Sequence, residues 1–412
     1  MTTNAQVNPN EQRGRRALFV PYGTVVQCDS SYLWQKNLGS YLDACARCFE
    51  NVRILCTVAD SNSRSYYQNG VPIYAYRMAA ENVTVRPFSG AKSLAALREL
   101  VAILKRETAV ADFVYVFVPS FKSLLAARLA EGRARPYGIY IGADWNDVAH
   151  FVLPRRLPRP LGALAKSIGA TLERHAVDNA AFTLAHGARI VRRYGGERKR
   201  TFGTVPVMNW GEEEISMRDD TCNEGLLRCL FVGTLTDRKG VIYLIDAVAA
   251  VRSRGIPIRL TIVGKGDHQY EEDLKERVVQ LGIVDSVEFC GYVVGAHELL
   301  RIYRVSDVFV LPTLGEGFPR VLYEAMSQSL PIITTNVGSL PDVLTDGETA
   351  LLVPIASADA IAGALERIWN EPALRRHLIA CGRELVSKTM GDDPRQQFEQ
   401  LLDRYVPRRA AR

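Results

Sequence analysis

Two glutamates at a loop-to-helix boundary have the spacing to hold the two ends of one elongated anionic ligand. Glu316 and Glu324 lie in the stretch Leu311-Pro-Thr-Leu-Gly-Glu-Gly-Phe-Pro-Arg-Val-Leu-Tyr-Glu-Ala-Met326. Pro319 suits the first turn of a helix because its missing N–H would have no helical partner there. Glu316 then falls in the loop and Glu324 about one turn inside the helix. The helix N-terminus between them offers free amides and a positive dipole end, and Gly317 lets a ligand approach the backbone closely.

The dimensions of this stretch match a nucleotide sugar. The rise from Pro319 to Glu324 is about 7–8 Å, which places Glu324 beside a ribose while the amides hold a diphosphate and Glu316 meets a group beyond it. A second loop, in Phe231-Val-Gly-Thr-Leu-Thr-Asp-Arg-Lys-Gly240, supplies Lys239 with Arg238 beside it. Such cations hold phosphates and stabilise a departing nucleoside diphosphate. Alone, an Arg-Lys-Gly loop is typical of a solvated turn, but the two glutamates favour the binding role.

A metal is the competing explanation for a carboxylate pair. A metal would require both glutamates to turn inward with further oxygen ligands near them. No Asp-x-Asp follows a predicted strand. We therefore expect a site without a metal, in which lysine and arginine balance the phosphate charge.

Alternating strand and helix patterns predict two doubly wound α/β domains that position these loops. Predicted strands cover 17–20, 52–58, 113–118 and 137–141, then 228–232, 259–263, 287–290, 308–311, 332–335 and 350–353. Predicted helices include 32–49, 93–105, 120–129 and 173–185, with another beginning beyond Gly240. Ligands of such sheets bind at the carboxyl ends of the strands, so two domains facing each other create a cleft. The predicted boundaries are a disordered lead at 1–16, a first domain at 17–205, a second at 206–390, and a last helix within 391–412.

Composition indicates a globular enzyme-sized chain. The 412 residues are 47% hydrophobic and 23% charged, which excludes disordered, fibrous and membrane-spanning classes. No apolar run of about 18 residues occurs, and the first 16 residues are polar, so we expect a cytoplasmic protein. Cys45 and Cys48 form a Cys-x-x-Cys on a predicted amphipathic helix, where core packing competes with redox or metal chemistry.

Charge is divided unevenly along the chain. Residues 1–205 carry 28 Lys+Arg and 15 Asp+Glu, or 28 − 15 = +13, which leaves 23 − 30 = −7 for residues 206–412. The basic excess lacks interleaved aromatic residues, so nucleic acid is not an expected partner. Two interpretations remain: a solvated basic face, or a face attracted to anionic lipid headgroups or to a phosphorylated acceptor.

The second half resembles family 4 of the retaining glycosyltransferases, which have the GT-B architecture. The resemblance covers about residues 228–354. It rests on these segments in this order: Val232-Gly-Thr-Leu235 with Lys239-Gly240, Ile262-Val-Gly-Lys-Gly-Asp267, Phe289-Cys-Gly-Tyr292, Glu316 to Glu324, Leu330-Pro-Ile-Ile333, Gly338-Ser-Leu-Pro-Asp342, and Asp346-Gly-Glu-Thr-Ala-Leu-Leu-Val-Pro354.

The resemblance implies a role for each matching residue. Glu316 would contact the transferred sugar, Glu324 the ribose hydroxyls, and Lys239 the diphosphate. Tyr292 would lie near the nucleobase, and the last helix would pack back on the first domain. The phosphates and sugar would meet the backbone around Gly317, Phe318, Val321 and Leu322, with Gly233 in the phosphate loop and Gly23 in the approaching loop of the first domain.

Two positions depart from the family pattern. Many members have arginine directly after the first glycine of the phosphate loop, where this chain has Thr234, so Arg238 is the candidate replacement. Many also carry a histidine at the end of the strand represented here by residues 137–141, and this chain offers Asp144 instead. Asp144 is therefore a candidate acceptor-side or catalytic carboxylate, with a helix N-cap before Trp145 as the alternative.

These observations predict a retaining, metal-independent glycosyltransferase. The expected donor is a UDP-sugar or GDP-mannose, which serves as co-substrate with no further cofactor. The expected acceptor is a hydroxyl of a saccharide, lipid-linked, in exopolysaccharide or related glycan biosynthesis, with the enzyme at the inner face of the membrane. Two alternatives remain open: a GT-B nucleotide-sugar 2-epimerase, and a catalytically silent nucleotide-sugar-binding partner of another transferase.

Overall fold

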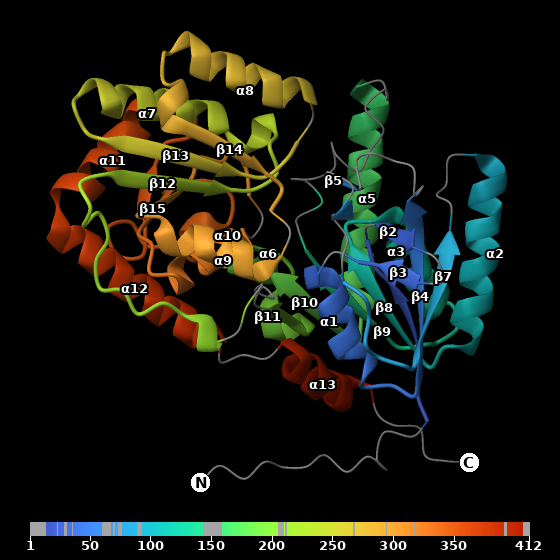
Figure 1. Ribbon diagram of the computed structural model, residues 1–412. Coiled ribbons are helices and arrows are strands. Elements are labelled where there is room, and N and C mark those ends of the chain that lie inside the picture. Colours follow the sequence, from blue (N-terminus) through green and yellow to red (C-terminus); the bar gives the residue numbers. More distant parts are fainter. Residues whose placement is uncertain are drawn as a thin grey trace, which may run out of the picture. The chain divides into compact units, whose positions relative to one another are not determined.

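The chain forms two compact α/β units (Figure 1). The computed structural model describes residues 14–22, 24–28, 31–34, 36–59, 67–68, 71–72, 76–88, 93–142, 145, 159–204, 210, 212–266, 268–293, 295–316, 319–390 and 394–406. The first unit comprises Met1–His186, Ile190–Thr204 and Asp393–Arg412, and the second comprises Gly187–Arg189 and Val205–Asp392. The C-terminal segment therefore belongs to the first unit.

The first unit is built on a nine-stranded sheet in the order β11-β10-β9-β8-β1-β4-β2-β3, with β7 also paired to β4. Its pairings are parallel except for the β2–β3 hairpin. The strands are β1 (Arg16–Val20), β2 (Thr24–Cys28), β3 (Ser31–Leu33), β4 (Asn51–Ala59), β7 (Val83–Phe88), β8 (Phe113–Val118), β9 (Tyr137–Ile141), β10 (Phe182–His186) and β11 (Thr201–Thr204), with a separate pair β5 (Tyr67–Gln68) and β6 (Val71–Pro72).

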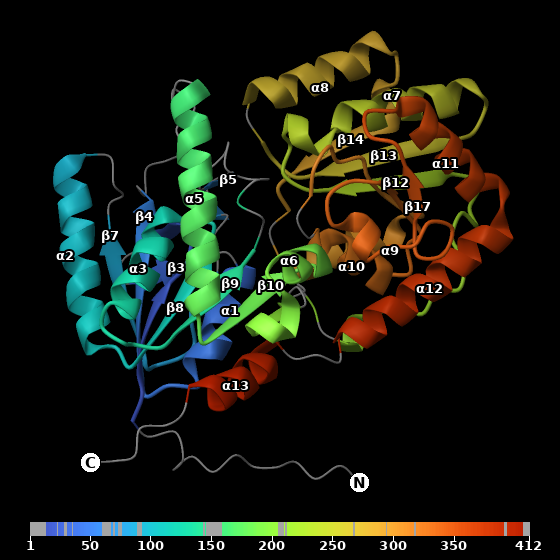
Figure 2. The ribbon, with the colours of Figure 1, turned by 180° about the vertical axis from the view of Figure 1, so that it is seen from behind.

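Helices cover both faces of this sheet. They are α1 (Lys36–Ala46), α2 (Leu94–Val110), α3 (Phe121–Glu131), α5 (Arg159–Asn179), α6 (Ala188–Arg193), the short η3 (Gly196–Lys199) and α13 (Pro394–Tyr405). Helix α3 packs between α2 and α5 (Figure 2), while α1 packs against α13. Leu18 and Val20 of β1 join the core cluster under α2, α3 and α5. Phe19 between them packs on Phe49 and Tyr115, as the two-residue period of a strand requires.

Helix α13 returns to the first unit, as predicted. Phe398 is fully buried, and its ring lies 4.8 Å from that of Tyr115 and 5.7 Å from that of Phe182. Gln397 donates a 2.7 Å hydrogen bond to the carbonyl of Gly203 in β11. The last helix therefore completes the core of the unit in which the chain began.

The second unit has a six-stranded parallel sheet in the order β14-β13-β12-β15-β16-β17. Its strands are β12 (Leu227–Val232), β13 (Ile258–Val263), β14 (Val287–Gly291), β15 (Val308–Leu311), β16 (Ile332–Thr335) and β17 (Leu351–Val353). Its helices are α7 (Val241–Ser253), α8 (His268–Gln280), α9 (Ala296–Val305), α10 (Arg320–Ser327), α11 (Ala358–Asn370) and α12 (Pro372–Met390), with short turns η4 (Glu212–Glu214), η5 (Asp237–Lys239), η6 (Val284–Ser286) and η7 (Leu340–Asp342).

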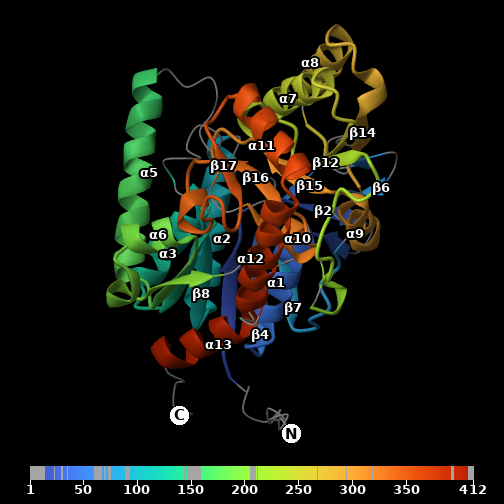
Figure 3. The same cartoon turned by 90° about the vertical axis from the view of Figure 1, so that its left-hand side faces the viewer.

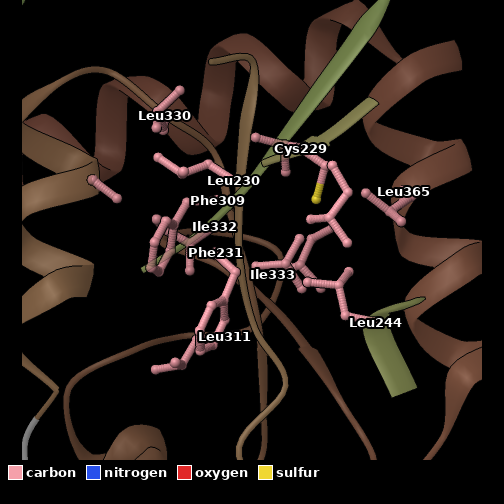
Figure 4. Close-up of a cluster of buried hydrophobic side chains, with 14 of the residues drawn as sticks. Cys229, Leu230, Phe231, Leu244, Phe309, Leu311, Leu330, Ile332, Ile333 and Leu365 are labelled. Carbon is pink, nitrogen blue, oxygen red and sulfur yellow. The ribbon is translucent and has the colours of Figure 1, made fainter. Parts of the chain in front are cut away.

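Apolar side chains from both faces hold this second sheet in place. Helices α10 and α12 lie against each other (Figure 3), and α7 packs against α11. Phe231, Phe309 and Ile333 of the central strands are fully buried, with Leu244 of α7 and Leu365 of α11 in the same cluster (Figure 4). Both α7 and α11 therefore anchor the strands whose ends carry the predicted site.

The prediction of a helix over 173–185 was wrong in its second half. Helix α5 ends at Asn179, and Phe182–His186 forms β10. The error arose because an alanine-rich sequence favours helix locally, whereas pairing between β9 and β11 imposes strand. The helix expected from residue 32 begins only at Lys36, after the hairpin of β2 and β3.

Candidate functional site

The two cations and one of the two predicted glutamates meet in the second unit. Lys239 donates to the carboxylate of Glu316, and Arg238 Nη1 lies 3.5 Å from Glu316 Oε1. The side chains of Lys239 and Glu316 are 12% and 7% exposed. The two loops meet because β12 and β15 are neighbouring parallel strands, whose carboxyl ends share one edge of the sheet.

Backbone contacts fix these two loops to each other. Leu314 N donates to the carbonyl of Arg238 at 2.7 Å. Thr313 Oγ1 donates to the same carbonyl at 3.1 Å and lies 3.3 Å from Glu316 Oε1. Gly240 has φ +64°, and a Cβ there would lie 2.2 Å from the carbonyl oxygen of Pro312. Only glycine therefore allows the lysine loop to approach the glutamate loop this closely.

Gly338 has a comparable role on the other side of Glu316. Its φ is +63°, and a Cβ there would lie 2.1 Å from the carbonyl oxygen of Glu316. Gly338 belongs to one of the segments on which the family resemblance rests, whereas Thr313 was given no role. Their signal in the sequence is weak because Thr313 reaches Arg238 only when β12 and β15 pair, and Gly338 reaches Glu316 only when β15 and β16 pair.

Glu324 lies inside α10 and is 1% exposed. Pro319 is the N-cap and the helix begins at Arg320, one residue later than expected. Arg320 Nε lies 3.1 Å from Glu324 Oε1, and Tyr303 in α9 donates to Glu324 Oε2 at 3.3 Å. Burial, together with the Glu324 charge, raises the pKa of Tyr303, so this hydroxyl remains a donor. The contacts orient a buried carboxylate near the start of α10.

The remaining predicted donor-side residues lie around this centre. Gly233 follows β12, where a Cβ on Gly264 would lie 1.8 Å from the Gly233 carbonyl oxygen. Val321 and Leu322 form the first turn of α10, and Leu322 is buried. Tyr292 follows β14 and is 38% exposed; partial burial raises its pKa and the charge of Arg320 opposes this.

Four predicted residues lie outside the described residues. They are Gly23, Asp144, Gly317 and Phe318. In the first unit, the described residue at the end of β10 is His186, whose Nε2 is hydrogen-bonded to the hydroxyl of Tyr140 in β9. Within the described ranges, no group of three or more His, Cys, Asp or Glu side chains could hold a metal ion.

The arrangement suits a phosphorylated ligand chemically. Glu316 is balanced by two cations, so a negative ligand meets no uncompensated carboxylate there. The Lys239 ammonium has three protons and can keep Glu316 while donating to a phosphate oxygen. Glu324 remains an acceptor for hydroxyl groups. The Cys-x-x-Cys is poorly suited to redox or metal chemistry, because Cys45 is buried and burial raises the pKa of the Cys48 thiol to about 12.

The part of the chain that is similar to known sequences lies in the second unit and includes this site. Residues 227–371 match the profile of the family described as Glycosyl transferases group 1. A phosphatidyl-myo-inositol mannosyltransferase from Mycobacterium leprae is 35% identical over 161 residues, covering 39% of this chain and 41% of the relative. A D-inositol 3-phosphate glycosyltransferase from Pseudarthrobacter chlorophenolicus is 31% identical over 214 residues, covering 49% and 51%. The aligned part thus spans about half or less of these relatives' length.

Solved structures resemble the whole chain in fold. The Anabaena protein HepE in complex with UDP-glucose superimposes with a TM-score of 0.65 at 17% identity, covering 95% of this chain and 100% of that one. A sucrose-phosphate synthase from Thermosynechococcus elongatus gives 0.63 at 19% identity, covering 95% and 99%. The two Rossmann-like units therefore form the GT-B fold. Within this fold, the second unit carries the match to the family described as Glycosyl transferases group 1.

Proposed function

We propose that this protein is a retaining glycosyltransferase that moves a sugar from a nucleotide diphosphate sugar to a hydroxyl of a saccharide acceptor. The observation that carries the proposal is the junction of the Lys239 and Glu316 loops beside α10, which holds the buried Glu324. Lys239 and Arg238 would hold the donor diphosphate, and Glu324 would accept hydrogen bonds from the ribose. Glu316 would contact the transferred sugar.

The proposed reaction needs no metal and no dedicated base. Lys239 and Arg238 stabilise the charge that develops on the leaving diphosphate. An oxygen of that diphosphate accepts the proton of the attacking hydroxyl on the same face of the sugar, so the anomeric configuration is retained. Asp144 stays a predicted acceptor-side carboxylate. A UDP-sugar or GDP-mannose is the proposed donor class, and HepE in complex with UDP-glucose supports a nucleotide-sugar ligand for this fold.

The proposed acceptor is lipid-linked, and the exposed face of α5 supports a peripheral position at the inner face of an anionic membrane. Residues 159–172 contain two cations and no Asp or Glu. Exposed apolar side chains repeat along one helix face: Leu161 at 52%, Leu164 at 56%, Ile168 at 48% and Leu172 at 42%. An apolar stripe on a basic unit matches an anionic lipid surface in both polarity and charge. In the described part of the chain, no helix is both long and apolar enough to cross a membrane.

Ligand-induced thermal stabilisation tests the donor assignment. A panel of nucleotide sugars would be added to the wild type, to Glu324→Ala, and to Glu276→Ala as the matched control. Glu276 is exposed on α8 in the same unit. One donor at a hundred times its Kd should stabilise the wild type by about 2.7 kcal/mol. The stabilisation should persist in Glu276→Ala and be lost or weakened in Glu324→Ala.

Two results would contradict the proposal. If no nucleotide or nucleotide sugar stabilised the wild type, the assignment of the donor site would be refuted. Donor binding followed only by conversion of the donor to its 2-epimer, without any acceptor, would replace transfer by epimerisation. Product analysis of the anomeric configuration then tests retention.

A further inference from the structure

Strands β8, β9, β10 and β11 of the first unit end side by side at one edge of its sheet. They are parallel, and their register pairs Phe117 with Tyr140 and His186 with Thr204. Tyr140 also pairs with Leu184, two residues before His186. Side chains alternate along a strand, so these side chains share one face of the sheet near the carboxyl ends of the strands. Ligands of open α/β sheets bind outside this edge.

Tyr140 fixes the orientation of the His186 imidazole at this edge. The hydroxyl of Tyr140 is hydrogen-bonded to Nε2 of His186, and the two ring centroids lie 4.9 Å apart. Tyr140 is itself 8% exposed, and its ring packs on Phe117 at 4.9 Å and on Tyr41 at 5.1 Å. His186 is only half-buried. The core therefore holds the tyrosine, and the tyrosine holds an imidazole that keeps exposed surface.

This hydrogen bond also determines the proton arrangement on His186. A phenol is a stronger acid than the N–H of a neutral imidazole, so Tyr140 donates and Nε2 accepts while the ring is neutral. The proton of the neutral ring then lies on Nδ1, and the imidazolium carries protons on both nitrogens. Nδ1 of His186 is therefore a hydrogen-bond donor in both protonation states.

A second tyrosine reaches the end of β9 from the side of β8. Tyr22 follows β1, and its ring lies edge-on to Phe117 at 6.0 Å. A Cβ on Gly142, just after β9, would lie 2.5 Å from the Tyr22 hydroxyl, so glycine allows this approach. Tyr22 is half-buried. Thr204, which is 6% exposed, adds a hydroxyl beside His186.

These four residues, Tyr22, Tyr140, His186 and Thr204, form a hydroxyl–imidazole cluster whose chemistry suits an uncharged sugar. The members supply three hydroxyls and one imidazole next to aromatic rings, without a carboxylate or an ammonium group. Small-molecule sites combine aromatic walls with a few placed polar groups, and a hydroxyl both donates and accepts. A sugar ring presents apolar C–H faces and hydroxyls at its rim, so it matches both features. A phosphate would instead favour cationic partners.

We infer that His186 donates a hydrogen bond to a hydroxyl of the acceptor saccharide, with Tyr140 as its positioning residue and Tyr22 beside the sugar ring. The inference rests on the proposed transferase function, and it names the part of the acceptor that is recognised as an uncharged sugar ring. His186 then binds the acceptor in the first unit, while Lys239 and Glu324 bind the donor in the second.

Binding of the intact, fluorescently labelled chain to immobilised neutral oligosaccharides tests the inference. The probes end in glucose, mannose, galactose or rhamnose, and each is tested with and without UDP or GDP. His186→Phe keeps a ring against Tyr140 and removes both nitrogens, whereas Tyr140→Phe keeps the imidazole and removes the bond that orients it. His297→Phe is the matched control, because its side chain is 91% exposed on α9.

The wild type and His297→Phe should bind the same oligosaccharide with equal affinity. His186→Phe should bind it about ten-fold or more weakly, and Tyr140→Phe about two- to ten-fold more weakly, as expected for one hydrogen bond. Donor-induced thermal stabilisation should be equal in all four proteins, because the proposed donor residues lie in the second unit. This second measurement separates a lost saccharide contact from a damaged fold.

Three results would overturn the inference. They are a wild type that binds none of the oligosaccharides, a His186→Phe protein that binds them as the wild type does, and a parallel loss of saccharide and donor binding in His186→Phe. The last result would assign His186 a purely structural role. A wild type that binds an oligosaccharide through His186 but binds no nucleotide sugar would keep the saccharide site and refute the transferase proposal.

Discussion

Removal of the Lys122 charge should stabilise the protein. Lys122→Met keeps an unbranched side chain of similar length and removes the ammonium. Burial lowers the pKa of Lys122 from 10.5 to about 8, and a tenfold change in a proton-binding constant corresponds to about 1.4 kcal/mol. Carrying the charge therefore costs the folded state about 3 kcal/mol at neutral pH, and solvent screening of a partly buried group reduces this to about 1–3 kcal/mol.

The pH dependence of that gain identifies its cause. Below pH 8 the folded and unfolded states both carry the proton, so the full cost is present. Between pH 8 and 10.5 the folded state binds fewer protons than the unfolded state, so wild-type stability rises with pH relative to Lys122→Met. Above 10.5 both states are neutral, and the difference due to charge disappears. The gain of Lys122→Met should therefore be largest at pH 7 and shrink toward pH 10.5.

Thermal and urea unfolding of the full chain at pH 7, 8, 9 and 10 would measure this gain. At about 2–4 °C per kcal/mol for a unit of this size, the expected rise in Tm at pH 7 is about 2–12 °C. Lys105→Met is the matched control and should leave Tm nearly unchanged. A Lys122→Met protein that is no more stable than the wild type at pH 7, or whose gain is independent of pH, would refute the reasoning.

Four further predictions concern the donor site, the second unit and the membrane face. Lys239→Met should lower kcat/KM for the donor found in the panel by about a hundred-fold or more, since charge on the leaving diphosphate loses its cation; initial rates beside Glu276→Ala measure this. Gly338→Ala should abolish donor-induced stabilisation because its Cβ would lie 2.1 Å from the Glu316 carbonyl, whereas Gly363→Ala in α11, with open space around its Cβ, should bind donor normally. Asp220→Asn should destabilise the second unit by about 3–5 kcal/mol in urea, because Arg375 is left buried without its carboxylate. Burial opposes ionisation of Asp220, but the hydrogen bonds from Arg375 and the Thr221 amide and the charges of Arg375 and Arg376 together outweigh it and lower the pKa of Asp220. The pair's contribution in the wild type should therefore be lost as the pH falls through that lowered pKa. Ile168→Glu should weaken co-sedimentation with anionic vesicles, while Val279→Glu, the same apolar-to-acidic change on exposed α8, should not; equal binding by both would argue against the α5 face.

The sequence alone predicted the class of fold because its strongest signals are local. All six residues of β8 are buried, and the apolar run predicted its bounds correctly. Glycines and charged residues after such runs identified the loops at the carboxyl edge. The residue types of Glu316, Glu324 and Lys239 indicated a phosphorylated ligand before any contact was known.

Tertiary structure decided what depends on strand order and packing. The Lys239 and Glu316 loops meet only because β12 pairs with β15, although the residues are separated by 77 positions. Strand β10 exists because its neighbours supply hydrogen bonds that outweigh local helix propensity. Lys122 looked like any solvated helix lysine in the sequence. The burial that lowers its pKa appeared only when α3 was packed over the end of β1, because burial is a property of the packed chain.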